Sequence, residues 1–305
     1  MKQVDIRWDD IEDSTGYLFS FAKSLAAAVK GSPYSELYED IIATSGFAFR
    51  MWVAADLCPS ATSIWSFQKQ KEWVENGGLV CGYVERLWGQ EDREKECLDQ
   101  AEELVKESVD AGVAAVSWDI SGSEWGLITG YDEESRMFAT AKIDGSEEEI
   151  PYEKLGKLDL PILSVLTIRG RKERSQEDIT KGMLTLAVSH LKGEEWCDNK
   201  QGMDAYPALI DCIRNQLTEE LAWNLEYYLG TYAALKKYAF NYFQKYNIAD
   251  LAESYRIVYE RWYQAYNAAK NKDISSDETK KELIQYLQGA YEAERKALQQ
   301  MQQKI

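Results

Sequence analysis

Residues 125–131 read Trp-Gly-Leu-Ile-Thr-Gly-Tyr, and residues 136–143 read Arg-Met-Phe-Ala-Thr-Ala-Lys-Ile. Both runs are rich in apolar, β-branched and aromatic side chains, and the polar segment 132–135, Asp-Glu-Glu-Ser, joins them. This pattern predicts two antiparallel strands connected by a turn. The runs at 113–118 and 162–168 have the same character and predict two further strands.

Helical patterns precede these strands. Apolar side chains recur every three or four residues in the segments 17–30, 34–43, 67–75 and 91–111. Helices followed by an antiparallel sheet indicate the α+β class. We therefore predict an α+β fold for the first part of the chain.

A charged run at 169–175, Arg-Gly-Arg-Lys-Glu-Arg-Ser, marks a change in the hydrophobic period and suits a linker. Beyond it the pattern is helical, and Ser276 with Thr279 supplies the capping chemistry for a last helix that ends near Gln302. We predict an α+β domain over 1–172 and an all-α helical bundle over 173–305. A stripe at helical spacing predicts core positions at Leu225, Tyr228, Leu229, Tyr232, Leu235 and Tyr238.

Composition and charge restrict the partners. The chain has 305 residues, 45% of them hydrophobic, which is enough for a sizeable core. Its 52 acidic and 35 basic residues give a net charge of −17, which argues against nucleic acid and anionic membranes. With no apolar run of about 18 residues and no apolar N-terminal segment, we expect a cytoplasmic protein without a membrane anchor. The helical domain could also form a homodimer or cap a cleft.

The single histidine, His190, excludes most arrangements that need an imidazole base. It lies on a predicted amphipathic helix, where a packing role is favoured. The five cysteines are odd in number and lack CxxC spacing, which predicts free thiols and argues against zinc. Signatures for dinucleotide, phosphate, hydrolase and zinc-protease sites are also missing, so we expect neither a cofactor nor a metal.

Three segments are poorly explained by packing alone. Arg50 ends the apolar run 45–50, where it is either a structural ion-pair anchor or an anion-binding group. Cys58 precedes a proline in a loop and is either a small buried thiol or a reactive one. Glu124 and Trp125 begin the predicted strand that ends at Tyr131, which places them at the rim of a sheet.

These segments, taken in order, resemble the papain-like domains of the butirosin-biosynthesis protein H type, which are related in fold to bacteriocin-processing cysteine peptidases. The resemblance extends to the later part of the chain, which is similar to a helical extension often found after such domains. It implies a papain-like α+β core with an appended helical domain. The segments that carry it are the helix 17–30 with Gly31 and Tyr34, then 45–50, 58–60, 126–132, 201–206 and 292–295.

A thiol enzyme of this fold needs a cysteine at the start of its first long helix and a histidine on a strand of the sheet. This chain has Ser14 and Thr15 before the predicted helix and Glu124 with Trp125 on the strand. The resemblance therefore implies a pseudoenzyme, because serine without a histidine or lysine base is a poor nucleophile at neutral pH.

The leading hypothesis is a catalytically degenerate papain-like domain that binds a small molecule or peptide in its cleft. Arg50 would meet a carboxylate or phosphate, Trp125 and Tyr131 would stack, and Glu124 would accept from an amine or hydroxyl. The predicted lining residues are Ser14, Arg50, Cys58, Glu124, Trp125 and Tyr131.

Two alternatives remain open. One is an acyltransferase or amide hydrolase in which Cys58 is the nucleophile and Glu124 is the base, with a pKa raised by burial. The other is an interaction protein whose acidic helical domain docks on a basic partner.

Overall fold

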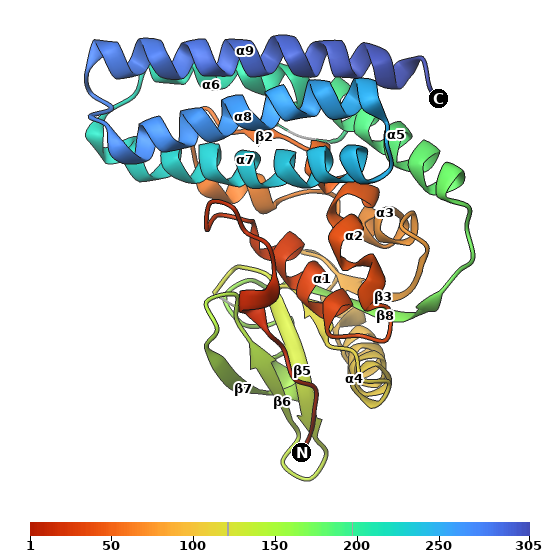
Figure 1. Cartoon of the computed structure of the whole chain (residues 1–305). Coiled ribbons are helices and arrows are strands. Elements are labelled where there is room, and N and C mark those ends of the chain that lie inside the picture. The colour runs from red at the N-terminus through yellow and green to blue at the C-terminus, as the bar shows by residue number, and fades with distance from the viewer. Residues whose placement is uncertain (121, 197) are drawn as a thin grey trace. The chain divides into compact units, whose positions relative to one another are not determined.

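The computed structural model describes residues 1–120, 122–196 and 198–305, which form two compact units (Figure 1). The first, here called the sheet unit, comprises Met1–Glu12, Ser20–Ile41 and Phe67–Arg174. The second, here called the helical unit, comprises Asp13–Phe19, Ile42–Ser66 and Ser175–Ile305. The predicted domains are single stretches of chain, whereas each compact unit is assembled from three segments.

The sheet unit contains one antiparallel sheet with seven described strands. The predicted combination of helices with an antiparallel sheet is confirmed. The strand β1 (Lys2–Gln3) pairs with β5 beside the main path of the sheet. Along that path the order is β3 (Leu79–Arg86), β8 (Leu163–Arg171), β4 (Ala115–Ser117), β5 (Gly126–Asp132), β6 (Met137–Ala141) and β7 (Glu147–Pro151).

The helices of this half of the chain lie close to their predicted positions. Their bounds are α1 (Ser20–Lys30), α2 (Tyr38–Thr44), α3 (Gln70–Glu75) and α4 (Glu94–Asp110). The spacing of Ala101, Leu104 and Val105 puts these side chains on one face of α4. They share a buried cluster with Ile128 of β5 and Val165 of β8, so α4 covers the core of the sheet unit.

Three strands of this sheet were missed, the two-residue β1 and the longer β3 and β7, and one linker was predicted wrongly. The strand β7 reads Glu-Glu-Glu-Ile-Pro, and its exposed glutamates carry no hydrophobic alternation. The strand β3 contains Gly82, which weakens the strand pattern. Arg169, Gly170 and Arg171 of the expected linker instead extend β8, where Arg171 pairs in register with Leu79.

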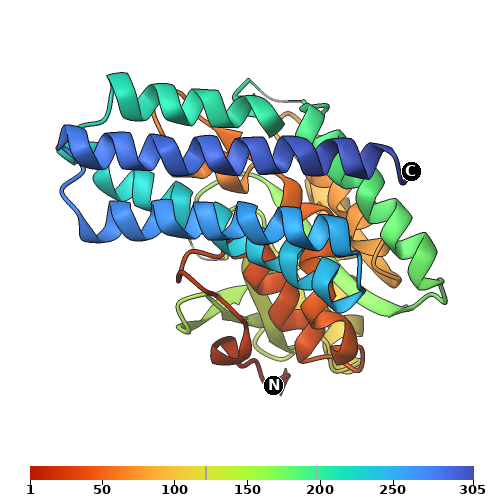
Figure 2. The same cartoon turned by 45° about the horizontal axis from the view of Figure 1, so that its top comes forward.

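Long helices make up most of the helical unit, which confirms the predicted helical region (Figure 2). The final helix begins after Ser276, whose hydroxyl accepts the backbone N–H of Thr279, as the capping pattern predicts. The tyrosine and leucine stripe predicted as core is buried throughout. The helices are α5 (Gln176–Lys192), α6 (Ala205–Asn215), α7 (Ala222–Lys245), α8 (Ala249–Asn271) and α9 (Asp277–Gln302).

Tyrosine hydroxyl groups attach the early segments of the helical unit to its helices. The Tyr232 hydroxyl accepts the backbone N–H of Trp52 at 2.8 Å and donates to the carbonyl oxygen of the same residue. One turn earlier on α7, the Tyr228 hydroxyl donates to the Cys58 carbonyl at 2.7 Å. These bonds explain why 42–66 belongs with helices that follow it by more than a hundred residues.

A buried carboxylate organises the centre of the helical bundle. Glu294 and Lys236 have no exposed surface, and the Lys236 ammonium lies 2.7 Å from Glu294 Oε1. Tyr206 donates to Glu294 Oε2 at 2.6 Å, and Tyr255 donates to Oε1 at 2.8 Å. Trp262 in turn donates to the Tyr206 hydroxyl at 2.8 Å, so four helices meet at one satisfied network.

The Glu294→Gln substitution is expected to destabilise the protein by about 3–5 kcal/mol, because it leaves the Lys236 ammonium buried without a counter-charge. The matched control is Glu292→Gln, which removes an exposed pair with Arg295 and should change stability by less than about 1 kcal/mol. Urea unfolding of both variants measures the difference. Equal free energies of unfolding would contradict a central role for the network.

Candidate functional site

The sheet unit brings a serine hydroxyl and a carboxylate together at the start of its first long helix. Ser20 is the first residue of α1, and Glu124 lies two residues before β5. The Ser20 hydroxyl donates to Glu124 Oε2 and accepts the backbone N–H of Trp125 at 3.2 Å.

Sequence reasoning missed Ser20 because it started the helix three residues too early. The predicted helix began at residue 17 and put Ser14 near its start, whereas α1 begins at Ser20. Ser14 instead belongs to the segment Asp13–Phe19 of the helical unit. There the Asp13 carboxylate accepts the N–H groups of Gly16 and Leu18, which form a turn before the helix. Serine is favoured at helix starts, and this preference could have identified Ser20 as the beginning of the helix.

The Glu124 carboxylate has an unusual environment. Burial raises its pKa, and the hydrogen bonds from Ser20 and the Trp125 N–H oppose that shift only in part. Within the described residues, no lysine, arginine or histidine forms an ion pair with it. The residue as a whole is partly exposed. Glu124 is therefore a largely desolvated carboxylate with no cationic partner among the described residues.

Trp125 supports Glu124 from the core side. Its side chain has no exposed surface. Its ring packs edge-on against Phe21 at 4.8 Å, Phe67 at 4.9 Å and Trp118 at 5.3 Å between centroids. This position suits a ring that fixes the neighbouring backbone better than one that stacks on a ligand.

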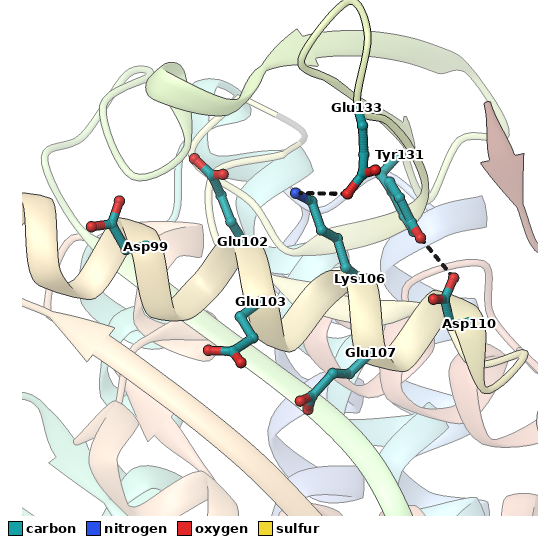
Figure 3. A pocket seen from close by; sticks show the side chains of 8 residues that line it. All are labelled: Asp99, Glu102, Glu103, Lys106, Glu107, Asp110, Tyr131 and Glu133. Carbon is teal, nitrogen blue, oxygen red and sulfur yellow. Dashed lines mark hydrogen bonds and ion pairs between the residues drawn. The ribbon is translucent and has the colours of Figure 1, made fainter.

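Tyr131 lies at the opposite end of β5 from Glu124. Seven residues of extended chain span about 20 Å, so these two side chains do not line one small-molecule site. The Tyr131 hydroxyl donates to Asp110 at 2.7 Å beside an open, acid-lined hollow of about 400 Å³ (Figure 3). Lys106 contributes the ammonium of this hollow and pairs with Glu133 at 3.4 Å.

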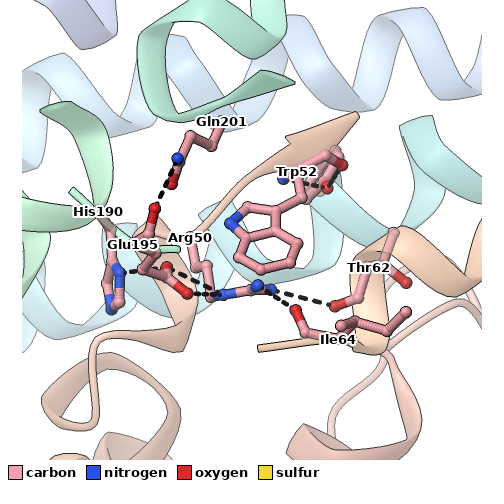
Figure 4. A network of polar contacts seen from close by, with 8 residues as sticks. Arg50, Trp52, Thr62, Ile64, His190, Glu195 and Gln201 are labelled. Carbon is pink, nitrogen blue, oxygen red and sulfur yellow. Dashed lines mark hydrogen bonds and ion pairs between the residues drawn. The ribbon is translucent and has the colours of Figure 1, made fainter. Parts of the chain in front are cut away.

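Arg50 belongs to the helical unit, where it is a structural ion-pair anchor (Figure 4). It is 4% exposed, and its Nε lies 3.0 Å from both oxygens of Glu195. Its other nitrogens donate to the carbonyl oxygens of Thr62 and Ile64. The guanidinium lies 4.0 Å from the ring centroid of Trp52. Of the two roles predicted for Arg50, the structure therefore has the ion-pair anchor.

His190 belongs to the same network, as a packing role predicts. It lies on α5, is 3% exposed, and places its Nδ1 2.7 Å from Glu195 Oε1. Burial alone would raise the pKa of Glu195, but Arg50 and His190 outweigh it and lower that pKa to about 2. Gly46, at φ 82°, passes beside the ring, and a Cβ there would come within 2.9 Å of His190 Nε2.

Cys58 also lies in the helical unit, in the predicted loop position before Pro59. Its thiol is partly exposed and lies 3.0 Å from the Ser60 hydroxyl, which is not a base. The prediction of free thiols is confirmed for four cysteines, while Cys197 lies outside the described residues. The four are Cys58, Cys81, Cys97 and Cys212.

Residues 1–120, 122–196 and 198–305 contain no group of three or more histidine, cysteine, aspartate or glutamate side chains placed to hold a metal ion. None of the helices in these ranges combines the length and apolar character that crossing a bilayer requires. The sequence matches no protein-family model, and comparison with curated proteins gives no significant match. Inferences about function therefore depend on the residues themselves.

The Glu195→Gln substitution is expected to destabilise the protein by about 3 kcal/mol at pH 7, because it removes the partner of Arg50 and His190. The folded-state pKa of Glu195, about 2, lies below its ordinary value of 4.5. The stabilisation is therefore complete above about pH 5 and disappears as the pH falls toward 2. Urea unfolding at several pH values, with the exposed Glu219→Gln as control, measures this. A difference that does not change with pH would contradict the assignment.

Proposed function

We propose that the sheet unit is a catalytically degenerate papain-like domain that binds a small molecule or a peptide beside Ser20 and Glu124. The observation that carries this proposal is the hydrogen bond between the first residue of α1 and the carboxylate before β5. In the papain-like fold, a helix start and a sheet strand supply the two reacting groups of a thiol enzyme. Here the helix start supplies a hydroxyl, and the segment two residues before β5 supplies an acid.

The chemistry of this pair favours binding over catalysis. A serine becomes a nucleophile only when a base of suitable pKa takes its proton. Glu124 is a carboxylate, and Ser20 is only 2% exposed, which leaves its oxygen little room to reach a substrate carbonyl. The single histidine of the chain lies in the helical unit against Glu195. No imidazole is therefore available to this site from the sheet unit.

The alternative enzyme, an acyltransferase or amide hydrolase with Cys58 as nucleophile, has less support. The group nearest its sulfur among the described hydrogen-bond partners is the Ser60 hydroxyl, which cannot take the thiol proton. Cys58 and Glu124 also belong to different compact units. The proposed binding function, in contrast, does not require Cys58 or Glu124 to take part in a reaction.

Screening a chemically diverse fragment library for binding by saturation-transfer NMR tests the proposal. We expect binders whose affinity falls at least about tenfold in Glu124→Gln, because the isosteric amide removes the charge at the site. The control is Glu133→Gln, which changes a largely exposed glutamate of the same unit and should retain binding.

A library whose binders are all insensitive to Glu124→Gln would contradict a ligand site at this pair. A fluorophosphonate modifies nucleophilic serines, so treating the wild-type protein with it tests whether the site has lost catalytic activity. Mass spectrometry should find Ser20 unmodified. A stoichiometric adduct on Ser20 would show instead that the pair retains nucleophilic activity.

A further inference from the structure

Among the described residues, Glu195, Glu294 and Asp119 are buried or nearly buried carboxylates whose charge is compensated. Glu195 has Arg50 and His190, and Glu294 has Lys236 with two tyrosine hydroxyls. Asp119 has no cation, but its two oxygens accept the backbone N–H groups of Ser123 and Leu160. Isolated carboxylates are costly to bury, which explains this pattern.

Glu124 departs from the pattern. Its Oε2 accepts the Ser20 hydroxyl and the Trp125 backbone N–H also bonds the carboxylate, while no side chain of the described residues forms a hydrogen bond or ion pair with Oε1. The arrangement repeats part of the Glu294 network, where a hydroxyl contacts Oε2 and an ammonium contacts Oε1. At Glu124 the hydroxyl is present, and the part of the chain that the structure describes supplies no ammonium.

We propose that the ligand of this site carries a protonated amine, which pairs with Oε1 of Glu124. This inference rests on the proposed binding function and specifies its ligand class. A carboxylate or phosphate would be repelled by Glu124 and by a chain of net charge −17, whereas a cation is attracted by both. A neutral hydroxyl would leave the charge of Glu124 uncompensated.

A compact ammonium also fits the occupied oxygen better than a guanidinium does. Guanidinium groups favour contacts with both oxygens of a carboxylate, as Arg50 makes with Glu195. The Ser20 hydroxyl already holds one oxygen of Glu124. An ammonium needs only one acceptor, as the 2.7 Å contact between Lys236 and Glu294 shows.

This pairing couples binding to proton release. Burial raises the pKa of Glu124, so in the free protein this group keeps its proton to a higher pH than an exposed glutamate does. An ammonium stabilises the ionised carboxylate and displaces that proton. Affinity therefore rises with pH until Glu124 is ionised in the free protein.

Three probes of one shape, benzylamine, benzyl alcohol and benzoate, separate these possibilities by isothermal titration calorimetry of the full chain. We expect benzylamine to bind at least about tenfold more tightly than the other two. Below the pH at which Glu124 ionises in the free protein, the binding enthalpy of benzylamine should change with the ionisation enthalpy of the buffer, which reports proton release. Glu124→Gln should abolish both effects, while Glu133→Gln should retain them.

A second variant, Ser20→Ala, keeps the test informative if Glu124→Gln unfolds. It leaves the carboxylate in place, so it should retain the preference for benzylamine.

Equal binding of the three probes, or tighter binding of benzoate, would overturn the amine assignment. If benzyl alcohol or benzoate binds in a manner that depends on Glu124, the binding site stands and only its ligand class is wrong. If no probe and no library fragment depends on Glu124, the proposed function fails as well.

Discussion

The helical unit depends on the requirement that buried tyrosine hydroxyls have hydrogen-bond partners. An unsatisfied buried hydroxyl costs about 1–3 kcal/mol, so each such tyrosine fixes the position of the group it contacts. Tyr228 and Tyr232 hold the backbone of the segment 42–66 against α7. Tyr266 donates to the carbonyl of Thr15 at 2.9 Å and holds the segment 13–19 in the same way. Side-chain chemistry, rather than chain order, therefore defines the unit.

The buried carboxylates of the two units differ in how their charge is compensated. Glu294 and Glu195 are compensated within the helical unit, and each stabilises a meeting point of several segments. Glu124 in the sheet unit has a hydroxyl and a backbone N–H nearby but no cation. Perturbed ionisable groups without a structural partner gather at functional sites, which supports its assignment to ligand binding. Arg50, in contrast, is fully engaged by Glu195 and two carbonyl groups.

The sequence predicts elements well where one face is apolar and poorly where pairing alone defines the element. The stripe from Leu225 to Tyr238 and the hairpin of β5 and β6 follow simple periods, and both are present. The strand β7 is acidic and is ordered by its pairing with β6, which no local pattern reports.

The site was only partly predictable for a related reason. Glu124 was identified from its place before an apolar strand, and a structural partner for Arg50 followed from the cost of burying a charge. Which acid pairs with Arg50 depends on a contact between residues 145 positions apart. Ser20 was missed because two buried residues, Leu18 and Phe19, extend the apolar pattern beyond the true helix start.

The proposed site depends on Glu124 being a desolvated carboxylate without a cationic partner among the described residues. The most direct test is the pH titration of its side-chain carboxyl ¹³C resonance in glutamate-labelled protein, assigned by its loss in Glu124→Gln. We expect a midpoint above the ordinary value of 4.5, because burial disfavours the charged form. A midpoint at or below that value would show that Glu124 is solvated or already paired, and would contradict a binding site at this carboxylate.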